Sequence, residues 1–140
     1  MKYWLLCLPR EDILNCMRVG TFGLSRKVLI GHVRKGDRIV CCAGKGDWKI
    51  VGLGTATSDY YVDDSKLFLK EGVFPDRFDF EAVSIPSESE VDIKAILDKL
   101  SFVKDLAFWA VSFRIGIVKL SKSDWDLIRD RARVSQAALK

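Results

Sequence analysis

The first part of the chain alternates apolar runs with short polar segments, a pattern that predicts strands joined by a helix and by turns. The bulky run Tyr3–Leu8 predicts a buried first strand, because Pro9 cannot continue a central ladder. Residues 10–19 predict a short helix that ends at Gly20. One face of this helix carries the apolar residues Ile13, Leu14 and Met17.

The next segments carry turn and strand signals. Residues 20–25 (Gly-Thr-Phe-Gly-Leu-Ser) predict a loop, and residues 33–37 predict a turn. Residues 37–43 and 49–57 predict two strands. The glycines of Gly44–Trp48, which lies between them, permit the positive φ angles of a tight hairpin. We therefore expect the two strands to pair in the antiparallel sense.

The second part of the chain is less regular. Residues 59–68 predict a short helix after a turn. Residues 78–85 alternate with a period of two and end at Pro86, which predicts a half-buried strand. Residues 89–100 repeat apolar positions at near-helical spacing, which predicts a helix.

The clearest helix signal lies near the end of the sequence. Ser121 and Asp124 resemble a capping box that opens a helix. One face of that helix carries Trp125, Ile128 and Ala132. The short connections and mixed strand patterns together favour an antiparallel or mixed sheet that closes on itself. The expected fold is α+β, a small barrel in a single domain over residues 1–140.

Composition supports one globular domain. The chain has 140 residues, of which 49% are hydrophobic and 30% charged, so it can bury a core without a disulfide or a metal. No apolar run approaches the roughly 18 residues of a membrane span. The residues from Met1 to Leu8 are too short and too aromatic for a signal peptide. We expect a cytoplasmic protein with no membrane contact.

The cysteines do not form a metal-binding pattern. No CxxC pair is present, and the only histidine is His32, so a structural zinc site is not expected. The adjacent Cys41 and Cys42 would face opposite sides of a strand. The four cysteines, Cys7, Cys16, Cys41 and Cys42, are interpreted as reduced, buried, small apolar residues.

Charge is unevenly distributed along the chain. Residues 18–49 contain eight basic and two acidic residues, a net charge of +6. Residues 50–113 contain six basic and twelve acidic residues, a net charge of −6. A one-sided basic region would attract a polyanion such as nucleic acid. The alternative is an ordinary solvated surface.

Catalytic signatures are weak. A serine or cysteine nucleophile would require His32 as its base, and no nucleophile motif surrounds that residue. The carboxylate pairs, such as Asp63-Asp64, occur where helix starts and loops favour acids. The glycines at 20–23 and 44–47 match neither the P-loop spacing nor GxGxxG. We therefore expect no enzyme, no metal and no cofactor.

Aromatic residues recur among basic and small polar ones. Phe22 precedes Ser25-Arg26-Lys27, Trp48 lies between Lys45 and Lys49, and a tyrosine pair occurs at 60–61. Trp109, Phe113 and Arg114 form a later group. Such rings can stack on unpaired bases while the cations hold phosphates. The alternative is that these rings belong to the core.

Several short motifs follow one another in an order that resembles a known family. They are Tyr3-Trp4, Thr21-Phe-Gly-Leu-Ser25, Lys35–Val40, Lys49–Gly54, Tyr60-Tyr-Val-Asp63 and Ser121-x-x-Asp124-Trp125. The ordered set resembles the EVE domain, a PUA-like fold related to the YTH domain, over nearly the whole chain. The resemblance implies a mixed, mostly antiparallel β-barrel flanked by short helices. It also implies an aromatic pocket that receives a modified nucleobase.

The resemblance further implies roles for single residues. Phe22 stands where related loops usually carry Trp, and it offers a smaller stacking face and no indole donor. Ser25 stands where a small polar residue would meet a base edge. Tyr60 or Tyr61 would form the opposite wall. Phe113-Arg114 matches the late segment near the pocket, where the arginine would contact a phosphate or a base edge.

These observations predict a non-catalytic domain, without cofactor, that binds one modified base of RNA or DNA, either single-stranded or extruded from a duplex. The expected state is a monomer. The expected nucleic-acid-binding residues are Phe22, Gly23, Ser25, Arg26, Lys27, Lys45, Trp48, Lys49, Tyr60, Tyr61, Phe113 and Arg114. Two alternatives remain: a small enzyme that uses the same cleft, and a protein-interaction module that buries Phe22 and Trp48 against a partner.

Overall fold

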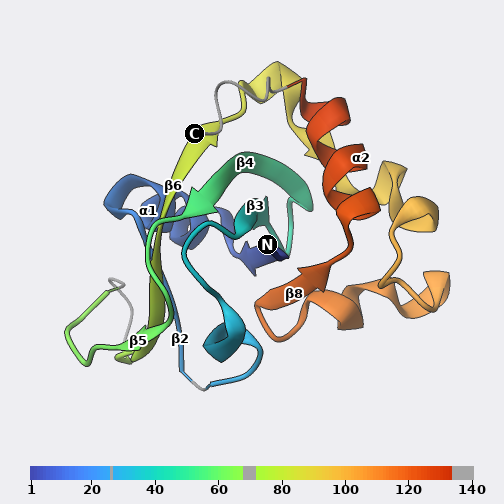
Figure 1. Ribbon diagram of the computed structural model, residues 1–140. Helices are drawn as coiled ribbons and strands as arrows, with labels where there is room; N and C mark the ends of the chain where they lie inside the picture. The colour runs from blue at the N-terminus through green and yellow to red at the C-terminus, as the bar shows by residue number, and fades with distance from the viewer. Residues whose placement is uncertain (26, 68–71, 134–140) are drawn as a thin grey trace.

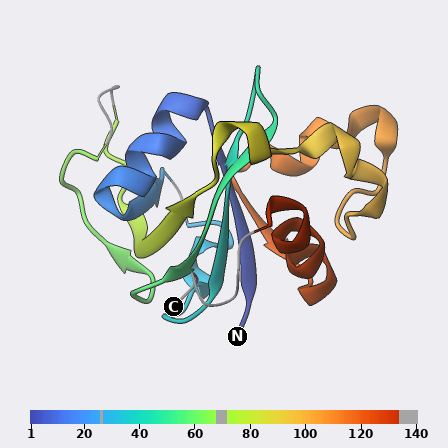
Figure 2. The same cartoon turned by 90° about the horizontal axis from the view of Figure 1, so that it is seen from above.

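The chain folds around one curled sheet with helices on both faces (Figures 1 and 2). The structure is a computed structural model that describes residues 1–25, 27–67 and 72–133. The strands are β1 (Tyr3–Leu8), β2 (Thr21–Leu24), β3 (Arg38–Ala43), β4 (Lys49–Ala56), β5 (Tyr61–Val62), β6 (Asp76–Ser84), β7 (Val91–Asp92) and β8 (Ile117–Leu120). The α-helices are α1 (Arg10–Val19) and α2 (Lys122–Ala132). The 3-10 helices are η1 (Ile30–His32), η2 (Ser87–Ser89), η3 (Ile93–Ala95), η4 (Leu97–Lys99) and η5 (Leu106–Phe113).

The sheet is mixed and mostly antiparallel, as predicted. Its strand order is β2-β6-β4-β3-β1-β8, with β5 added to β6 and β7 to β4. Strands β1 and β3 pair in parallel, whereas β1–β8, β3–β4, β4–β6 and β2–β6 pair antiparallel. The two ends of this order approach each other, since a Cβ on Gly116, just before β8, would lie 3.1 Å from Leu24 Cδ2 of β2. The result is the α+β half-barrel that the sequence predicts.

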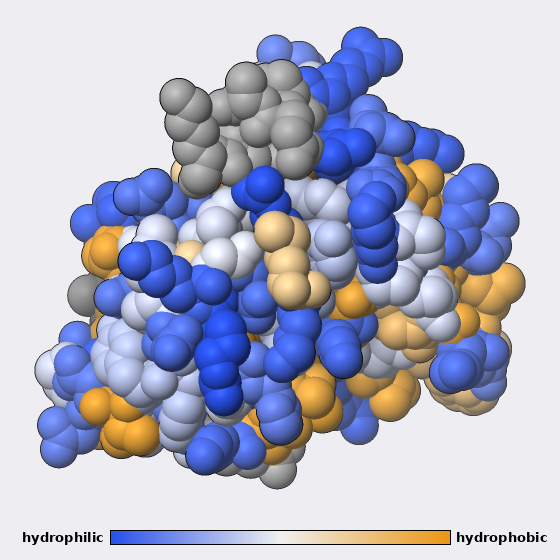
Figure 3. Space-filling view, in the orientation of Figure 1, coloured by the Kyte–Doolittle hydropathy of each residue, from blue (hydrophilic) through white to orange (hydrophobic). Residues whose placement is uncertain are grey.

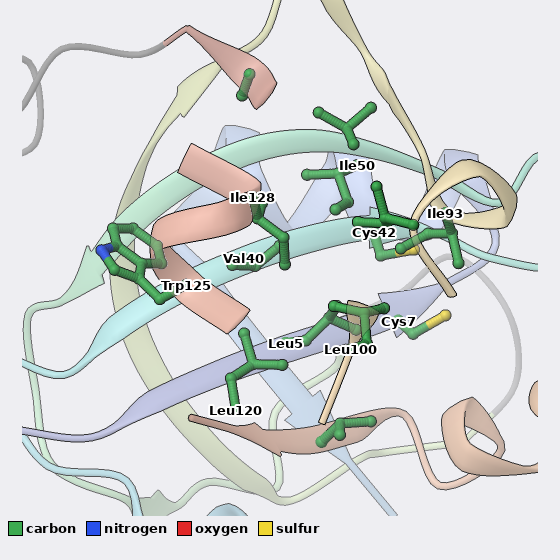
Figure 4. Close-up of a cluster of buried hydrophobic side chains, with 14 of the residues drawn as sticks. Leu5, Cys7, Val40, Cys42, Ile50, Ile93, Leu100, Leu120, Trp125 and Ile128 are labelled. Carbon is green, nitrogen blue, oxygen red and sulfur yellow. The ribbon is translucent and has the colours of Figure 1, made fainter. Parts of the chain in front are cut away.

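Two hydrophobic cores lie on the two faces of this sheet. The core on the face of α1 contains Trp4, Phe22, Phe78 and Phe80 together with Ile13 of the helix. The core on the face of α2 contains Leu5, Val40, Trp125 and Ile128 and the apolar residues of η3 and η4. Figure 4 shows Ile128 and Trp125 of α2 beside Val40 of the sheet, with Leu5 below them. The central strands are therefore buried on both sides.

Local sequence signals located several elements correctly. The first strand, α1, the β3–β4 hairpin and β6 lie where the pattern predicts them. Gly20 ends α1 in the left-handed region with φ of 80°. Ser121 and Asp124 form a complete capping box at the start of α2. Cys41 and Cys42 face the two different cores, also as predicted.

Three predicted elements are wrong. Residues 21–24 are a strand instead of a loop, because they pair with residues 76–79 of β6. Residues 59–67 contain the short strand β5 instead of a helix, and Phe68, the last residue of that prediction, lies outside the described residues. Residues 89–100 form β7 and two 3-10 turns instead of a helix. An apolar spacing of three residues suits a 3-10 turn as well as an α-helix.

The four cysteines lie in the interior of the fold. None of the four cysteines forms a disulfide, and all four are buried. Burial raises the pKa of the Cys41 thiol well above its ordinary value.

The part of the chain that the structure describes has no helix with the length and apolar character to cross a bilayer.

Candidate functional site

A cleft of about 710 Å³ opens on the face of α2. It lies between the end of β1, the turn of the β3–β4 hairpin and η5. The residues that line it are Cys7, Leu8, Pro9, Gly44, Lys45, Trp48, Ala107, Phe108, Trp109, Ala110, Val111, Phe113 and Arg114. Four of the predicted binding residues meet here: Lys45, Trp48, Phe113 and Arg114.

Three rings form one wall of the cleft. Trp48 and Trp109 meet almost edge to face, with centroids 4.7 Å apart and planes at 76°. Phe113 lies 5.5 Å from Trp48 and 6.0 Å from Trp109, again in edge-to-face geometry. Phe102 supports Phe113 from behind at 5.4 Å. Such edge-to-face contacts hold the rings in fixed orientations. Trp48 and Trp109 stay partly exposed, whereas Phe113 is buried beneath them at 3% exposure.

The hairpin holds Trp48 in a strained backbone conformation. The amides of Asp47 and Trp48 both donate to the carbonyl of Gly44, at 2.9 Å each. This tight turn places Gly46 at φ of 95° and Trp48 at φ of 54°. A bulky residue in the left-handed region is uncommon and costs free energy.

Two cations flank the cleft. Lys45 and Arg114 are exposed, and neither forms an ion pair with another described residue. The nearby acid Asp47 is paired with Arg10 Nε at 3.1 Å. The two other Arg10 nitrogens, Nη1 and Nη2, bind Glu90 at 3.2 and 2.9 Å. The rim therefore keeps a positive charge, and Arg10 ties the hairpin to α1 and to the segment before β7.

The described lining of the cleft contains no carboxylate and no histidine. Its floor is formed by Cys7, Leu8 and Pro9 together with Gly44. A Cβ on Gly44 would lie 2.8 Å from Cys7 Sγ, so a glycine is needed for the hairpin to approach β1 this closely. No group of three or more potential metal ligands occurs among the residues that the structure describes. The cleft is therefore suited to stacking and charge contacts.

The other predicted residues lie elsewhere. Phe22 and Gly23 of β2 are buried in the core on the face of α1, where Phe22 packs against Phe78 at 5.8 Å. Ser25 and Lys27 are exposed on the segment that follows. Arg26 lies outside the described residues. Lys49 is paired with Asp92 at 3.6 Å beside the hairpin.

The segment after β5 packs closely against β2 at Gly23. A Cβ on Gly23 would lie 2.8 Å from Leu67 Cδ2 and 2.9 Å from the carbonyl of Phe74. The buried Arg77 holds this segment in place by donating to the carbonyls of Val73 and Phe74, both at 2.9 Å. The Phe22 side chain points to the opposite face of β2, into the core on the face of α1, where it packs against Phe78 and presents no face to solvent.

The two predicted tyrosines are held by carboxylates of β6. The hydroxyl of Tyr60 donates to Asp76 Oδ1 and that of Tyr61 to Asp79 Oδ1, both at 2.6 Å. The hydrogen bond with Asp76 raises the pKa of Tyr60. Burial, with the bond to Asp79, raises the pKa of Tyr61 to about 12. The ammonium of Lys27 lies 5.0 Å from the centroid of the Tyr60 ring.

The expected meeting of Phe22, a tyrosine and Phe113 in one cleft is therefore corrected. Phe22 and Tyr60 belong to the core region on the face of α1, whereas Trp48 and Phe113 belong to the face of α2. The sheet separates the two groups. The rings lie in two groups, and the cleft described above contains the group with Trp48.

Sequence reasoning noted Trp109 but did not include it in the site, and it missed Phe108. Both residues line the cleft. The available signal was the apolar run of residues 106–111, which has no alternating or helical pattern that would bury all of its members. Phe108 and Val111 are exposed in the structure, at 70% and 54%.

A comparison with models of protein families identifies the family of this chain. The model of the family described as "EVE domain" matches residues 2–131. This chain belongs to the EVE domain family. A relative of this EVE domain is the UPF0310 protein PH1033 of Pyrococcus horikoshii. It is 26% identical over 143 residues, covering 91% of this chain and 97% of the relative.

Solved structures share the fold of this EVE domain. The NMR structure of Rpa0253 from Rhodopseudomonas palustris has a TM-score of 0.64 at 18% identity, over 95% of this chain and 94% of that one. The Mmi1 YTH domain has a TM-score of 0.61 at 10% identity, over 94% of this chain and 75% of that one. At such identities the likeness concerns the fold alone. It agrees with the PUA-like architecture that the sequence predicts.

Proposed function

We propose that this EVE domain is a non-catalytic nucleic-acid-binding module that accepts one nucleobase in the cleft beside Trp48. The observation that carries the proposal is the open cleft whose wall is formed by Trp48, Trp109 and Phe113, with the unpaired cations Lys45 and Arg114 at its rim. Membership of the EVE family and the YTH-like fold support the same class of function.

The physical basis is stacking combined with charge. A base stacked on an aromatic side chain contributes about 1–3 kcal/mol, and nearby cations neutralise the phosphates of its strand. A methyl group buried on such a base adds about 0.8 kcal/mol, so a modified base would be preferred by shape. The absence of a carboxylate or histidine from the described lining favours binding over acid–base catalysis.

The test is a titration of labelled single-stranded oligonucleotides, with and without 5-methylcytosine or N6-methyladenine, at two salt concentrations. Binding should weaken as salt increases, because phosphate contacts release counterions. Trp109→Ala should weaken binding about 5- to 100-fold, as expected for the loss of one stacking surface. Tyr61→Phe is the matched control, because Tyr61 does not line the cleft, and it should bind like the parent. Absent or salt-independent binding would overturn the proposal.

One observation favours a second candidate, a protein-interaction surface. Leu106, Phe108, Val111 and Ile115 are all exposed around η5. Contiguous exposed apolar residues often mark an interface. In Figure 3, hydrophobic surface gathers along the right-hand edge, on the side where η3 to η5 lie in Figure 1. Solution mass, measured alone and with oligonucleotides, distinguishes the candidates, since self-association that buries this patch would favour the second.

A further inference from the structure

Phe108 differs from the other aromatic residues of the cleft. Trp48, Trp109 and Phe113 contact one another, whereas Phe108 has no ring partner among the described residues. Its side chain is 70% exposed, although it lines the same cleft. An aromatic ring left open at the rim of an aromatic cleft is an unused stacking surface.

The local backbone fixes Phe108 in this position. Asp105 caps η5, since its carboxylate accepts from the amide of Ala107 at 2.9 Å and its carbonyl accepts from the amide of Phe108 at 3.2 Å. Phe108 itself has φ of −124° and ψ of 35°, which interrupts the helical path of η5. The interruption separates Phe108 from the ring cluster that contains its neighbour, Trp109. The backbone that carries the exposed ring is therefore held by a capped turn.

The cleft leaves room for more than one heterocycle. Its volume of about 710 Å³ lies in the upper part of the range of about 300–1,000 Å³ that small-ligand sites occupy. The inner part is bounded by Trp48, Trp109 and Phe113, and the outer part by Phe108 and Val111. Lys45 and Arg114 line the cleft and can contact the phosphates of a bound strand. Arg10 pairs with Asp47, so this carboxylate does not offset the positive charge of the two cations.

We infer that the cleft and Phe108 together bind two consecutive bases of an unpaired strand, one inside the ring cluster and its neighbour stacked on Phe108. This inference rests on the proposed function and specifies its ligand. A base extruded from an otherwise intact duplex leaves its neighbours stacked in the helix, where they cannot reach Phe108. A free nucleotide has no neighbour at all. The ligand class is thus single-stranded nucleic acid of at least two nucleotides.

The test compares three probes with the parent protein and two variants. The probes are a labelled eight-nucleotide single strand in RNA and DNA form, unlabelled nucleoside monophosphates as competitors, and a duplex with one bulged base. Phe108→Ala should weaken binding of the single strand about 5- to 100-fold and leave competition by the monophosphates unchanged. Leu106→Ala is the control, because Leu106 is exposed at 59% on the same segment but does not line the cleft. It should bind as the parent does.

The outcomes separate the two proposals. Two results together support the inference. The single strand binds at least about tenfold more tightly than a monophosphate or the bulged duplex, and Phe108→Ala weakens its binding whereas Leu106→Ala does not. Equal binding of all three probes, unchanged by Phe108→Ala, overturns the inference but leaves the proposed function intact. No binding of any probe overturns both. A change of solution mass in Phe108→Ala without a change in affinity assigns the ring to self-association and also overturns the inference.

Discussion

Trp48 and Trp109 lie edge to face, with ring centroids 4.7 Å apart, although they come from a hairpin turn and from a 3-10 segment far along the chain. The contact joins the sheet to η5 and forms the wall of the cleft. Each ring restricts the rotation of the other, so the wall is already shaped before a ligand arrives. Preorganisation of this kind lowers the entropic cost of binding.

Replacement of Trp48 should reveal the strain of its backbone. Trp48→Ala and Trp48→Gly both remove the ring, but glycine adopts φ of 54° without steric cost. Trp48→Gly should therefore be more stable than Trp48→Ala by about 1 kcal/mol, the reverse of the usual order within a strand. Urea unfolding of the two variants measures the difference. A more stable alanine variant would contradict the left-handed conformation.

Removal of Arg10 should loosen the hairpin and weaken binding without unfolding the protein. Arg10 bridges Asp47 of the hairpin and Glu90, and the hydrogen bond to Glu90 raises its pKa. These partly exposed pairs contribute about 1 kcal/mol or less to stability. Arg10→Ala should lower oligonucleotide affinity several-fold while far-UV circular dichroism stays unchanged. Arg131→Ala, an exposed cation on α2, should change neither quantity.

Lys45 and Arg114 should each contribute to the salt dependence of binding. Both are exposed at the cleft and lack an ion pair in the described part of the chain. If each neutralises one phosphate, the slope of log K against log salt should fall by about 1 for each alanine variant. Binding isotherms at four salt concentrations provide the slope. Slopes equal to that of the parent would assign the phosphate contacts to other residues.

Gly54 should tolerate no side chain. A Cβ there would lie 2.0 Å from the carbonyl oxygen of Glu81 and 2.8 Å from Ala82 Cα, both in the backbone of β6. Gly54→Ala should cost about 3 kcal/mol or more, because β4 and β6 must separate. Gly31→Ala is the control, since the atoms nearest to its Cβ would belong to the flexible, exposed side chain of Lys27. Its effect should stay within about 0.5 kcal/mol in the same denaturation experiment.

Stability should decrease at alkaline pH in a way that depends on Tyr61. The pKa of its hydroxyl is raised to about 12 in the folded protein from the ordinary value of about 10. The folded state thus retains this proton where the unfolded state loses it, so the contribution is complete below pH 10 and disappears as the pH rises through 12. Tyr61→Phe should flatten the fall in unfolding free energy between these values. An identical pH profile in both proteins would contradict the raised pKa of Tyr61.

Much of the fold could be predicted because its signals are local. The turn glycines located the β3–β4 hairpin, and Ser121 with Asp124 located α2. Strand β2 could not be predicted from its own residues, because its conformation depends on pairing with β6 far along the chain. The same holds for β5, where the hydroxyls of Tyr60 and Tyr61 bind carboxylates of β6. These segments obtain their structure from distant partners.

The site was predictable only in part, for a related reason. Trp48 and Arg114 were identified because aromatic and basic residues lie close to them in the sequence, and both line the cleft. Phe22 also has basic and small polar neighbours in sequence, but its ring is buried in the core against Phe78. Composition indicates which residues could stack on a base. Only the tertiary packing determines which of them remain open.

Strand β3 contributes Cys41 to the core on the face of α1 and Cys42 to the core on the face of α2. Neither core can dissolve without exposing the same strand, so the molecule should melt in one cooperative step. An occupant of the cleft would then slow amide hydrogen exchange in α1 as well, although that helix lies on the far side of the sheet from the η5 wall.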